Sequence, residues 1–226
     1  MYTLCVICAR TGSKGVKNKN FLKIKGKSLI RHTVDFAVKS NFFDYIAVSV
    51  DKKKISLGKN STKTIFIQRP SKLAKSSSNK LDVIRHAVKF CEKETKKNFA
   101  YIFDLDVTSP LRNLKDLKNA FKKFKKENAS NLFSVTPSRK NPYFNMIEIR
   151  KKRVKLVNPS KNLIHNRQKA PKTFDMNASI YIWKKKSLFK TNNLFNKKTS
   201  IFVMPLERSI DIDSDFDLKL VKHLWK

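Results

Sequence analysis

Apolar residues recur along this chain in two spacings, and the two alternate as far as about residue 137. Short continuous apolar runs are typical of strands that are buried on both faces of a parallel sheet. These runs cover residues 2–9, 45–50, 64–67, 99–107 and 131–137. Between them, apolar side chains three and four positions apart predict amphipathic helices over residues 28–40, 81–94 and 114–127.

Alternation of strands and helices predicts a three-layer, Rossmann-like α/β fold with a mostly parallel sheet. Right-handed crossovers place the loops that follow the strands along one edge of this sheet, where ligands bind in such folds. Ser28 is a candidate N-cap of the first helix. Because 226 residues with 40% hydrophobic content suit one core, we expect a single domain over residues 1–226.

The alternation breaks down over residues 138–172, which we expect to form a protruding arm within the domain. Residues 141–159 place alternating apolar side chains on two short segments, which predicts a β-hairpin. Beyond the arm, the pattern predicts two further strands and a closing helix, which begin near Ala178, Ser200 and Ser214. Ser214 is the candidate cap of that last helix.

The net charge of +34 makes a nucleic-acid-binding protein one alternative. The lysines, however, occur in nearly every predicted loop and helix, whereas a nucleic-acid site needs a concentrated basic stripe or tail. We therefore expect small-molecule substrates rather than nucleic acid. No apolar run approaches the roughly 18 residues of a membrane span, and the apolar start is too short for an export signal. The expected location is the cytoplasm, with no membrane partner.

The cysteines Cys5 and Cys8 match a C-x-x-C spacing, which occurs in redox and zinc sites. Positions i and i+3 of a strand point to opposite faces of a sheet, so these two thiols do not converge. We expect both of them, and Cys91, to be reduced packing residues.

Half of the four glycines, Gly12 and Gly15, fall in one short loop between Arg10 and Lys19. Glycines let a backbone approach a ligand closely and turn its N–H groups toward an anion. The loop matches neither the ATPase P-loop nor the dinucleotide fingerprint. Its position after the first strand favours a loop that binds a triphosphate, the alternative being a basic surface turn.

Acidic residues are scarce, and several of the 17 are grouped. Asp104 and Asp106 form one pair and Asp211 and Asp213 another. In an extended segment, residues i and i+2 share a face, so Asp211 and Asp213 can approach one divalent cation. The alternative is a helix cap favoured by the macrodipole, which is the better interpretation for Asp215 and Asp217.

The segment "ICARTGSKGVKNKN" resembles the signature loop of the acylneuraminate cytidylyltransferases, which activate sialic-acid-like sugars as CMP esters. Further motifs of that family follow in the same order, from Leu4 to Leu220: "RPSKLAKSSSNKLDVIRHA", "DVTSPLR", "NPYF", "RQKAPKTFDMNASIYIW" and "ERSIDIDSDFDL". The resemblance implies a nucleotide-diphospho-sugar transferase fold and Mg²⁺-assisted transfer of CMP from CTP to a nonulosonic acid, releasing pyrophosphate. It also implies a homodimer paired through the arm.

Site residues carried over from the resemblance fall into four groups. The nucleotide contacts are Ala9, Arg10, Gly12, Ser13, Lys14, Asn20, Arg69, Ser77 and Ser78. The catalytic group is Arg10, Lys14, Lys19 and Asp211, and the metal ligands are Asp211 and Asp213. The sugar-acid contacts are Asp106, Ser109, Arg112, Arg167, Gln168 and Asn177. An arginine suits a sugar carboxylate because its planar fork binds both oxygens, although Arg112 and Arg167 also suit structural or surface roles.

The chain departs from the family pattern at three positions. Asp106 stands where the family commonly has a glutamine that reaches the sugar, and an aspartate there repels a carboxylate unless a cation or an amide donor lies beside it. Asp106 is therefore a candidate metal ligand or a determinant of which sugar is used. Ala178 replaces a glycine, and Ser76 replaces an aspartate.

The motifs leave two alternative functions open. The first is activation of the eight-carbon acid 3-deoxy-manno-octulosonate, although those enzymes carry Gly-Asp-Glu-Pro where this chain has "VTSPLR". The second is an inactive homologue that only binds the nucleotide, which Lys14, Lys19, Asp211 and Asp213 argue against.

Overall fold

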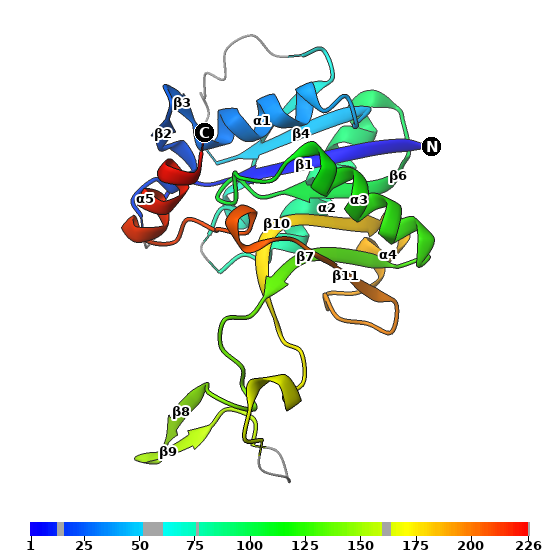
Figure 1. Ribbon diagram of the computed structural model, residues 1–226. Coiled ribbons are helices and arrows are strands. Elements are labelled where there is room, and N and C mark those ends of the chain that lie inside the picture. The colour runs from blue at the N-terminus through cyan, green and yellow to red at the C-terminus, as the bar shows by residue number, and fades with distance from the viewer. Residues whose placement is uncertain (13–15, 52–60, 76, 160–163, 226) are drawn as a thin grey trace.

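A seven-stranded sheet forms the centre of the computed structural model, which describes residues 1–12, 16–51, 61–75, 77–159 and 164–225. The strand order is β11-β7-β10-β6-β1-β4-β5 (Figure 1). The strands are β1 (Tyr2–Ala9), β4 (Tyr45–Val50), β5 (Thr64–Gln68), β6 (Phe99–Leu105), β7 (Asn131–Pro137), β10 (Phe174–Lys184) and β11 (Thr199–Val203). Neighbours pair in parallel except at β10, which is antiparallel to both β6 and β7. The mostly parallel sheet expected from the sequence is thus confirmed.

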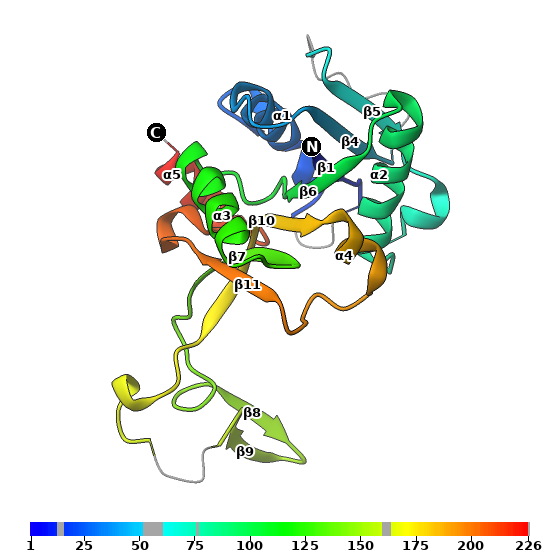
Figure 2. The same ribbon diagram turned by 90° about the vertical axis from the view of Figure 1, so that its right-hand side faces the viewer.

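Two helical layers cover the sheet (Figure 2). One layer contains α1 (Leu29–Lys39), α3 (Leu114–Lys126) and α5 (Asp215–Leu224). The other contains α2 (Lys80–Thr95) and α4 (Lys185–Lys190). Each layer packs its apolar stripe on the sheet, as an amphipathic helix must in order to bury that stripe.

Strand β1 shows how both faces of the sheet become buried. Cys5 and Ile7 pack into the core beneath α1 and α3, while Leu4 and Val6 pack into the core beneath α2. Cys5 and Cys8 therefore point to opposite faces, and all three cysteines of the chain are free thiols, as expected. Removing a fully buried aliphatic side chain from water contributes about 1.5–3 kcal/mol, so this strand is a major source of stability.

Polar caps fix where the helices begin. Ser28 accepts a hydrogen bond from the backbone N–H of Arg31, which confirms it as the N-cap of α1. Ser214 caps α5 in a capping box with Asp217, so the Asp217 carboxylate accepts a backbone hydrogen bond at the start of this helix. In the part of the chain that the structure describes, no helix is long and apolar enough to cross a membrane.

The arm leaves the sheet after β7 and returns as β10 (Figure 1). It carries the hairpin of β8 (Ile147–Arg150) and β9 (Arg153–Leu156), followed by the short helix η3 (Arg167–Lys169). Pro137 pairs directly with Phe174, so β7 and β10 form a hairpin whose connection is the arm. This connection makes β10 antiparallel, because the chain re-enters the sheet at the end where it left.

Candidate functional site

A cavity of about 290 Å³ opens at the ends of β1 and β6, at the sheet edge where ligands were expected. It is lined by Cys8, Arg10, Lys19, Asn20, Arg69, Leu73, Lys75, Ser78, Lys80, Val83, Asp106, Thr108 and Asp211. Burial raises the pKa of the Cys8 thiol to about 12, so this group stays protonated and is no nucleophile.

Two cationic side chains of the cavity, Arg10 and Lys19, come from the segment after β1. Asn20 is buried and donates its side-chain N–H to the carbonyl of Arg10 at 2.9 Å, which holds the two ends of the loop together. Lys19 Nζ donates to the carbonyl of Ile212 at 2.8 Å and to Asp213 Oδ1 at 2.6 Å. Gly12 has a φ of +75°, a conformation that favours glycine. The predicted contacts Ser13 and Lys14 lie outside the described residues.

Arg69 forms part of the cavity floor and is held in place by the ends of two strands. Its guanidinium donates to the carbonyl of Ala9 at 3.2 Å and to the carbonyl of Ser49 at 2.9 Å. These bonds fasten β1 to β4 beneath the cavity. Of the two serines expected near the base, Ser78 lines the cavity, whereas Ser77 is exposed and is not among the lining residues.

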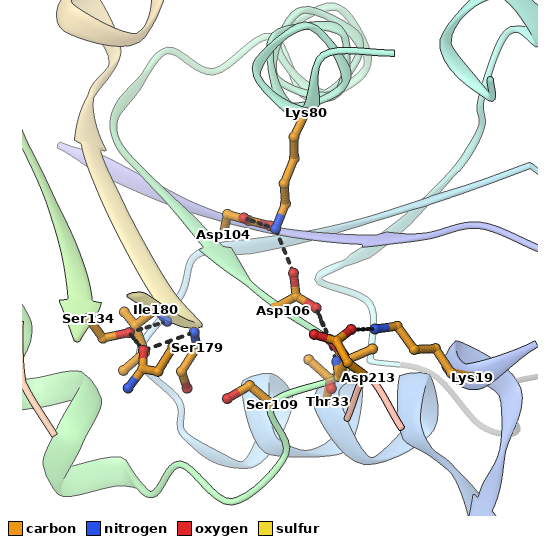
Figure 3. A network of polar contacts seen from close by, with 12 residues as sticks. Lys19, Thr33, Lys80, Asp104, Asp106, Ser109, Ser134, Ser179, Ile180 and Asp213 are labelled. Atoms are coloured by element: carbon orange, nitrogen blue, oxygen red, sulfur yellow. Dashed lines mark hydrogen bonds and ion pairs between the residues drawn. The ribbon is translucent and has the colours of Figure 1, made fainter. Parts of the chain in front are cut away.

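A further charged group at the cavity is formed by Lys80, Asp104 and Asp106 (Figure 3). The two aspartates were singled out from the sequence, whereas the lysine was not. Lys80 Nζ lies 2.7 Å from Asp104 Oδ2 and 2.7 Å from Asp106 Oδ2. Burial disfavours the charged ammonium, but the two carboxylates outweigh it and raise the pKa of Lys80 well above its usual value. Burial also favours the neutral form of Asp106, yet Lys80 and two hydrogen bonds from Thr108 bring its pKa below the usual range.

Asp211 reaches the same cavity from the segment before α5. The backbone N–H of Ile212 donates to the carbonyl of Thr108 at 2.9 Å, so this segment is tied to the loop that follows β6. Burial, followed by the nearby charge of Asp106, raises the pKa of Asp211 above its usual value. Asp213, the other half of the predicted metal pair, is 74% exposed, bonds to Lys19 and is not among the residues lining the cavity.

The donor set around Asp211 fits a magnesium ion held mainly by its substrate. Asp211 Oδ1 is buried and has no hydrogen-bond partner in the described structure. Within the described ranges, no three Asp, Glu, His or Cys side chains converge as a metal-binding group. Mg²⁺ is commonly held by one or two carboxylates together with water and phosphate oxygens, and Asp211 on the cavity wall suits that arrangement.

Arg112 and Ser109 lie beneath the cavity rather than in its lining, and both are buried. Arg112 Nη1 donates to the carbonyls of Ser109 at 2.6 Å and Ser179 at 3.0 Å, and Nη2 donates to the carbonyl of Asp106 at 2.5 Å. The guanidinium therefore binds the backbone of β10 and of the loop that follows β6. Burial lowers its pKa to about 10, so it stays charged at neutral pH.

Asn177 is also buried and bonded within the protein. Its Oδ1 accepts from Ser134 Oγ at 2.6 Å, and its Nδ2 donates to Ser209 Oγ at 2.8 Å. The next residue, Ala178, has a φ of +55° where the pairing register of β10 shifts. This left-handed conformation explains physically why a glycine suits the position, and it costs an alanine about 1 kcal/mol.

Arg167 and Gln168 line a second cavity, of about 570 Å³, at the base of the arm. Arg167 Nη2 donates to the carbonyl of Ser138 at 2.6 Å. Neither residue is among those lining the first cavity. Within one chain, the structure therefore brings together Arg10, Lys19, Asn20, Arg69, Ser78, Asp106 and Asp211, but not these two.

Comparisons of the sequence with known proteins point to one family. A family model described as cytidylyltransferase matches residues 4–223. The chain is 38% identical over 224 residues to the post-translational flagellin modification protein B of Campylobacter coli, covering 99% of this chain and 94% of that protein. It is 41% identical over 222 residues to the CMP-N,N'-diacetyllegionaminic acid synthase of Campylobacter jejuni, covering 98% and 94%.

A solved structure shares the fold at much lower identity. The structure of CMP:2-keto-3-deoxy-manno-octonic acid synthetase complexed with CTP matches with a TM-score of 0.67 at 15% identity, covering 100% of this chain and 98% of that one. The sequence match spans nearly the whole chain, and the cavity lies where α/β folds of this kind bind ligands. This chain is a member of the cytidylyltransferase family.

Proposed function

We propose that the protein couples CTP to a nonulosonic acid, giving a CMP-sugar and pyrophosphate, with a diacylated legionaminic acid as the first substrate to test. The relative at 41% identity is named for synthesis of CMP-N,N'-diacetyllegionaminic acid, and it matches 98% of this chain. One structural observation carries the proposal: a single cavity is lined both by cationic side chains and by the carboxylates Asp106 and Asp211.

The cationic side chains of the cavity suit the phosphates of CTP. Arg10 and Lys19 line the cavity, and Lys14 belongs to the same segment of the sequence. In the proposed reaction, the anomeric hydroxyl of the sugar acid attacks the α-phosphate, the bond to the β-phosphate oxygen breaks, and pyrophosphate leaves. The protein orients the two substrates and offsets the charge that develops on the leaving group. Lys19 is also held by Asp213, which positions its ammonium.

Magnesium is the proposed cofactor, with Asp211 as its main protein ligand and Asp213 as the second predicted one. When bound, the ion would supply positive charge to the phosphate oxygens. We place this chemistry in the cytoplasm, as expected from the sequence.

A pyrophosphate-release assay with a panel of sugar acids tests the proposed function. With CTP and Mg²⁺, we expect turnover with legionaminic, neuraminic or pseudaminic acid derivatives. Turnover with 3-deoxy-manno-octulosonate alone would favour the eight-carbon alternative. CTP binding without pyrophosphate release across the panel, from a folded protein, would contradict the proposal.

We also propose that the arm pairs two copies of the chain. Ile147 and Ile149 on β8 lie opposite Leu156 and Val154 on β9, so one face of the hairpin is apolar. Ile147, Ile149 and Val154 are 61%, 76% and 65% exposed. Exposed aliphatic side chains gathered on one face are typical of a surface that another protein covers.

A charge on the apolar face of the hairpin tests this pairing. We expect Ile149→Glu to halve the molar mass measured by light scattering, because a carboxylate would be buried without a partner. Lys155→Glu is the matched control, since residue 155 points to the opposite face of the same hairpin. A monomeric unaltered protein, or a dimeric Ile149→Glu variant, would contradict pairing through this face.

A further inference from the structure

Lys80 occupies an unusual position at the edge of the nucleotide cavity. It is the first residue of α2, directly after the N-cap Asn79, and it reaches across to β6 (Figure 3). Its ammonium lies 2.7 Å from a carboxylate oxygen of Asp104 and 2.7 Å from one of Asp106. It also lies 5.3 Å from the centre of the Tyr181 ring. One lysine thus connects the helix α2 to the floor of the cavity.

Stability alone does not account for this arrangement. Asp104 is fully buried on a central strand, and its Oδ1 has no hydrogen-bond partner among the described residues. Taking a carboxylate out of water costs several kcal/mol, and an apolar pair of similar size is often as stable as a buried ion pair or more so. A buried charge at the edge of a substrate cavity is more consistent with a role in binding or catalysis.

Lys80 and Asp106 both line the cavity, whereas Asp104 is not among the lining residues. Lys80 holds Asp106 Oδ2, while Thr108 donates its backbone N–H and its hydroxyl to Oδ1, at 3.1 and 2.9 Å. Contacts to both oxygens therefore fix the orientation of the Asp106 carboxylate. Its negative charge is offset by the lysine, although the side chain is still 21% exposed.

From these contacts we propose that Lys80 is a positioning residue for the sugar acid: it fixes the Asp106 carboxylate and offsets its charge, so that an anionic sugar can bind beside it. This inference rests on the proposed function. Nonulosonic acids carry a carboxylate, and like charges brought together in a cavity cost several kcal/mol. Asp106 Oδ2 keeps room for a second hydrogen bond, so a hydroxyl or amide N–H of the sugar can donate to it.

Steady-state kinetics with each substrate varied in turn test the role of Lys80. For Lys80→Met we expect the KM for the sugar acid to rise at least about 30-fold, while the KM for CTP changes less than about threefold. Lys80→Arg keeps the charge and should stay close to the unaltered protein. Lys93→Met is the matched control, because it removes one charge from the exposed surface of the same helix.

Double variants distinguish the loss of the Lys80 charge from a loss of folding. Lys80→Met/Asp106→Asn has the same net charge around Asp104 as the unaltered protein, so we expect part of the lost affinity for the sugar acid to return. If Lys80→Met does not fold, Lys80→Met/Asp104→Asn removes the unpaired buried charge and should show the same rise in the KM for the sugar acid. No turnover by the unaltered protein would overturn both the function and the inference. Turnover with an unchanged KM for the sugar acid in the folded Lys80 variants would overturn the inference alone.

Discussion

Replacing Asp211 by asparagine will lower kcat by at least about 10²–10³-fold, the loss typical of removing one preorganised electrostatic contact to the transition state. Asp211 lines the cavity, and one of its carboxylate oxygens is buried with no hydrogen-bond partner among the described residues. An amide has nearly the same shape but carries no charge to hold a divalent cation. Pyrophosphate release at saturating CTP and sugar acid measures the effect.

The fold should survive this substitution. Burial and the charge of Asp106 both disfavour the ionised form of Asp211 and raise its pKa, so the neutral amide removes an unfavourable interaction. We expect a free energy of unfolding at least equal to that of the unaltered protein. Asp215→Asn is the matched control, because that carboxylate is exposed in the first turn of α5 and should leave kcat unchanged. Near-normal turnover by Asp211→Asn would contradict the proposed role of Asp211 as a metal ligand.

Arg112→Met will lower the free energy of unfolding by about 3–5 kcal/mol, because buried carbonyls left without a donor cost about 1–3 kcal/mol each. The guanidinium is buried and donates to the carbonyls of Asp106, Ser109 and Ser179. Methionine fills part of the volume but donates no hydrogen bond. Urea denaturation followed by circular dichroism measures the change.

Arg139→Met provides the comparison for Arg112, since that arginine is exposed. Its replacement should change the free energy of unfolding by less than about 0.5 kcal/mol, as is usual for surface substitutions. A loss below about 1 kcal/mol for Arg112→Met, together with a large rise in the KM for the sugar acid, would restore Arg112 as a substrate ligand.

Much of the fold could be predicted from apolar spacing. The first strand was expected over residues 2–9, which are the bounds of β1. The caps Ser28 and Ser214 were also predicted correctly, because a capping side chain bonds to backbone within a few residues. The helix α4 was missed, since six residues, three of them lysines, give too short an apolar pattern. The direction of β10 was missed because it depends on where the arm rejoins the sheet.

The family assignment made from the motifs is confirmed by the family match, whereas the roles of single residues stay predictions. Motif residues include both ligand contacts and residues that hold the site together, and a sequence does not separate the two. Arg112 and Asn177 bond to neighbouring protein groups, a fact visible only in three dimensions. Lys80 was missed for a different reason: in a chain with 51 lysines and arginines, one more lysine carries little information.

The direct pairing of Pro137 with Phe174 has a consequence for how this family can diversify. Because the two strands already meet where the arm departs, everything between them can lengthen, shorten or change its composition without shifting the register of the central sheet. Lengthening such a connection has only a small entropic cost. The arm can therefore change in length and composition while the strands that carry the cavity are preserved.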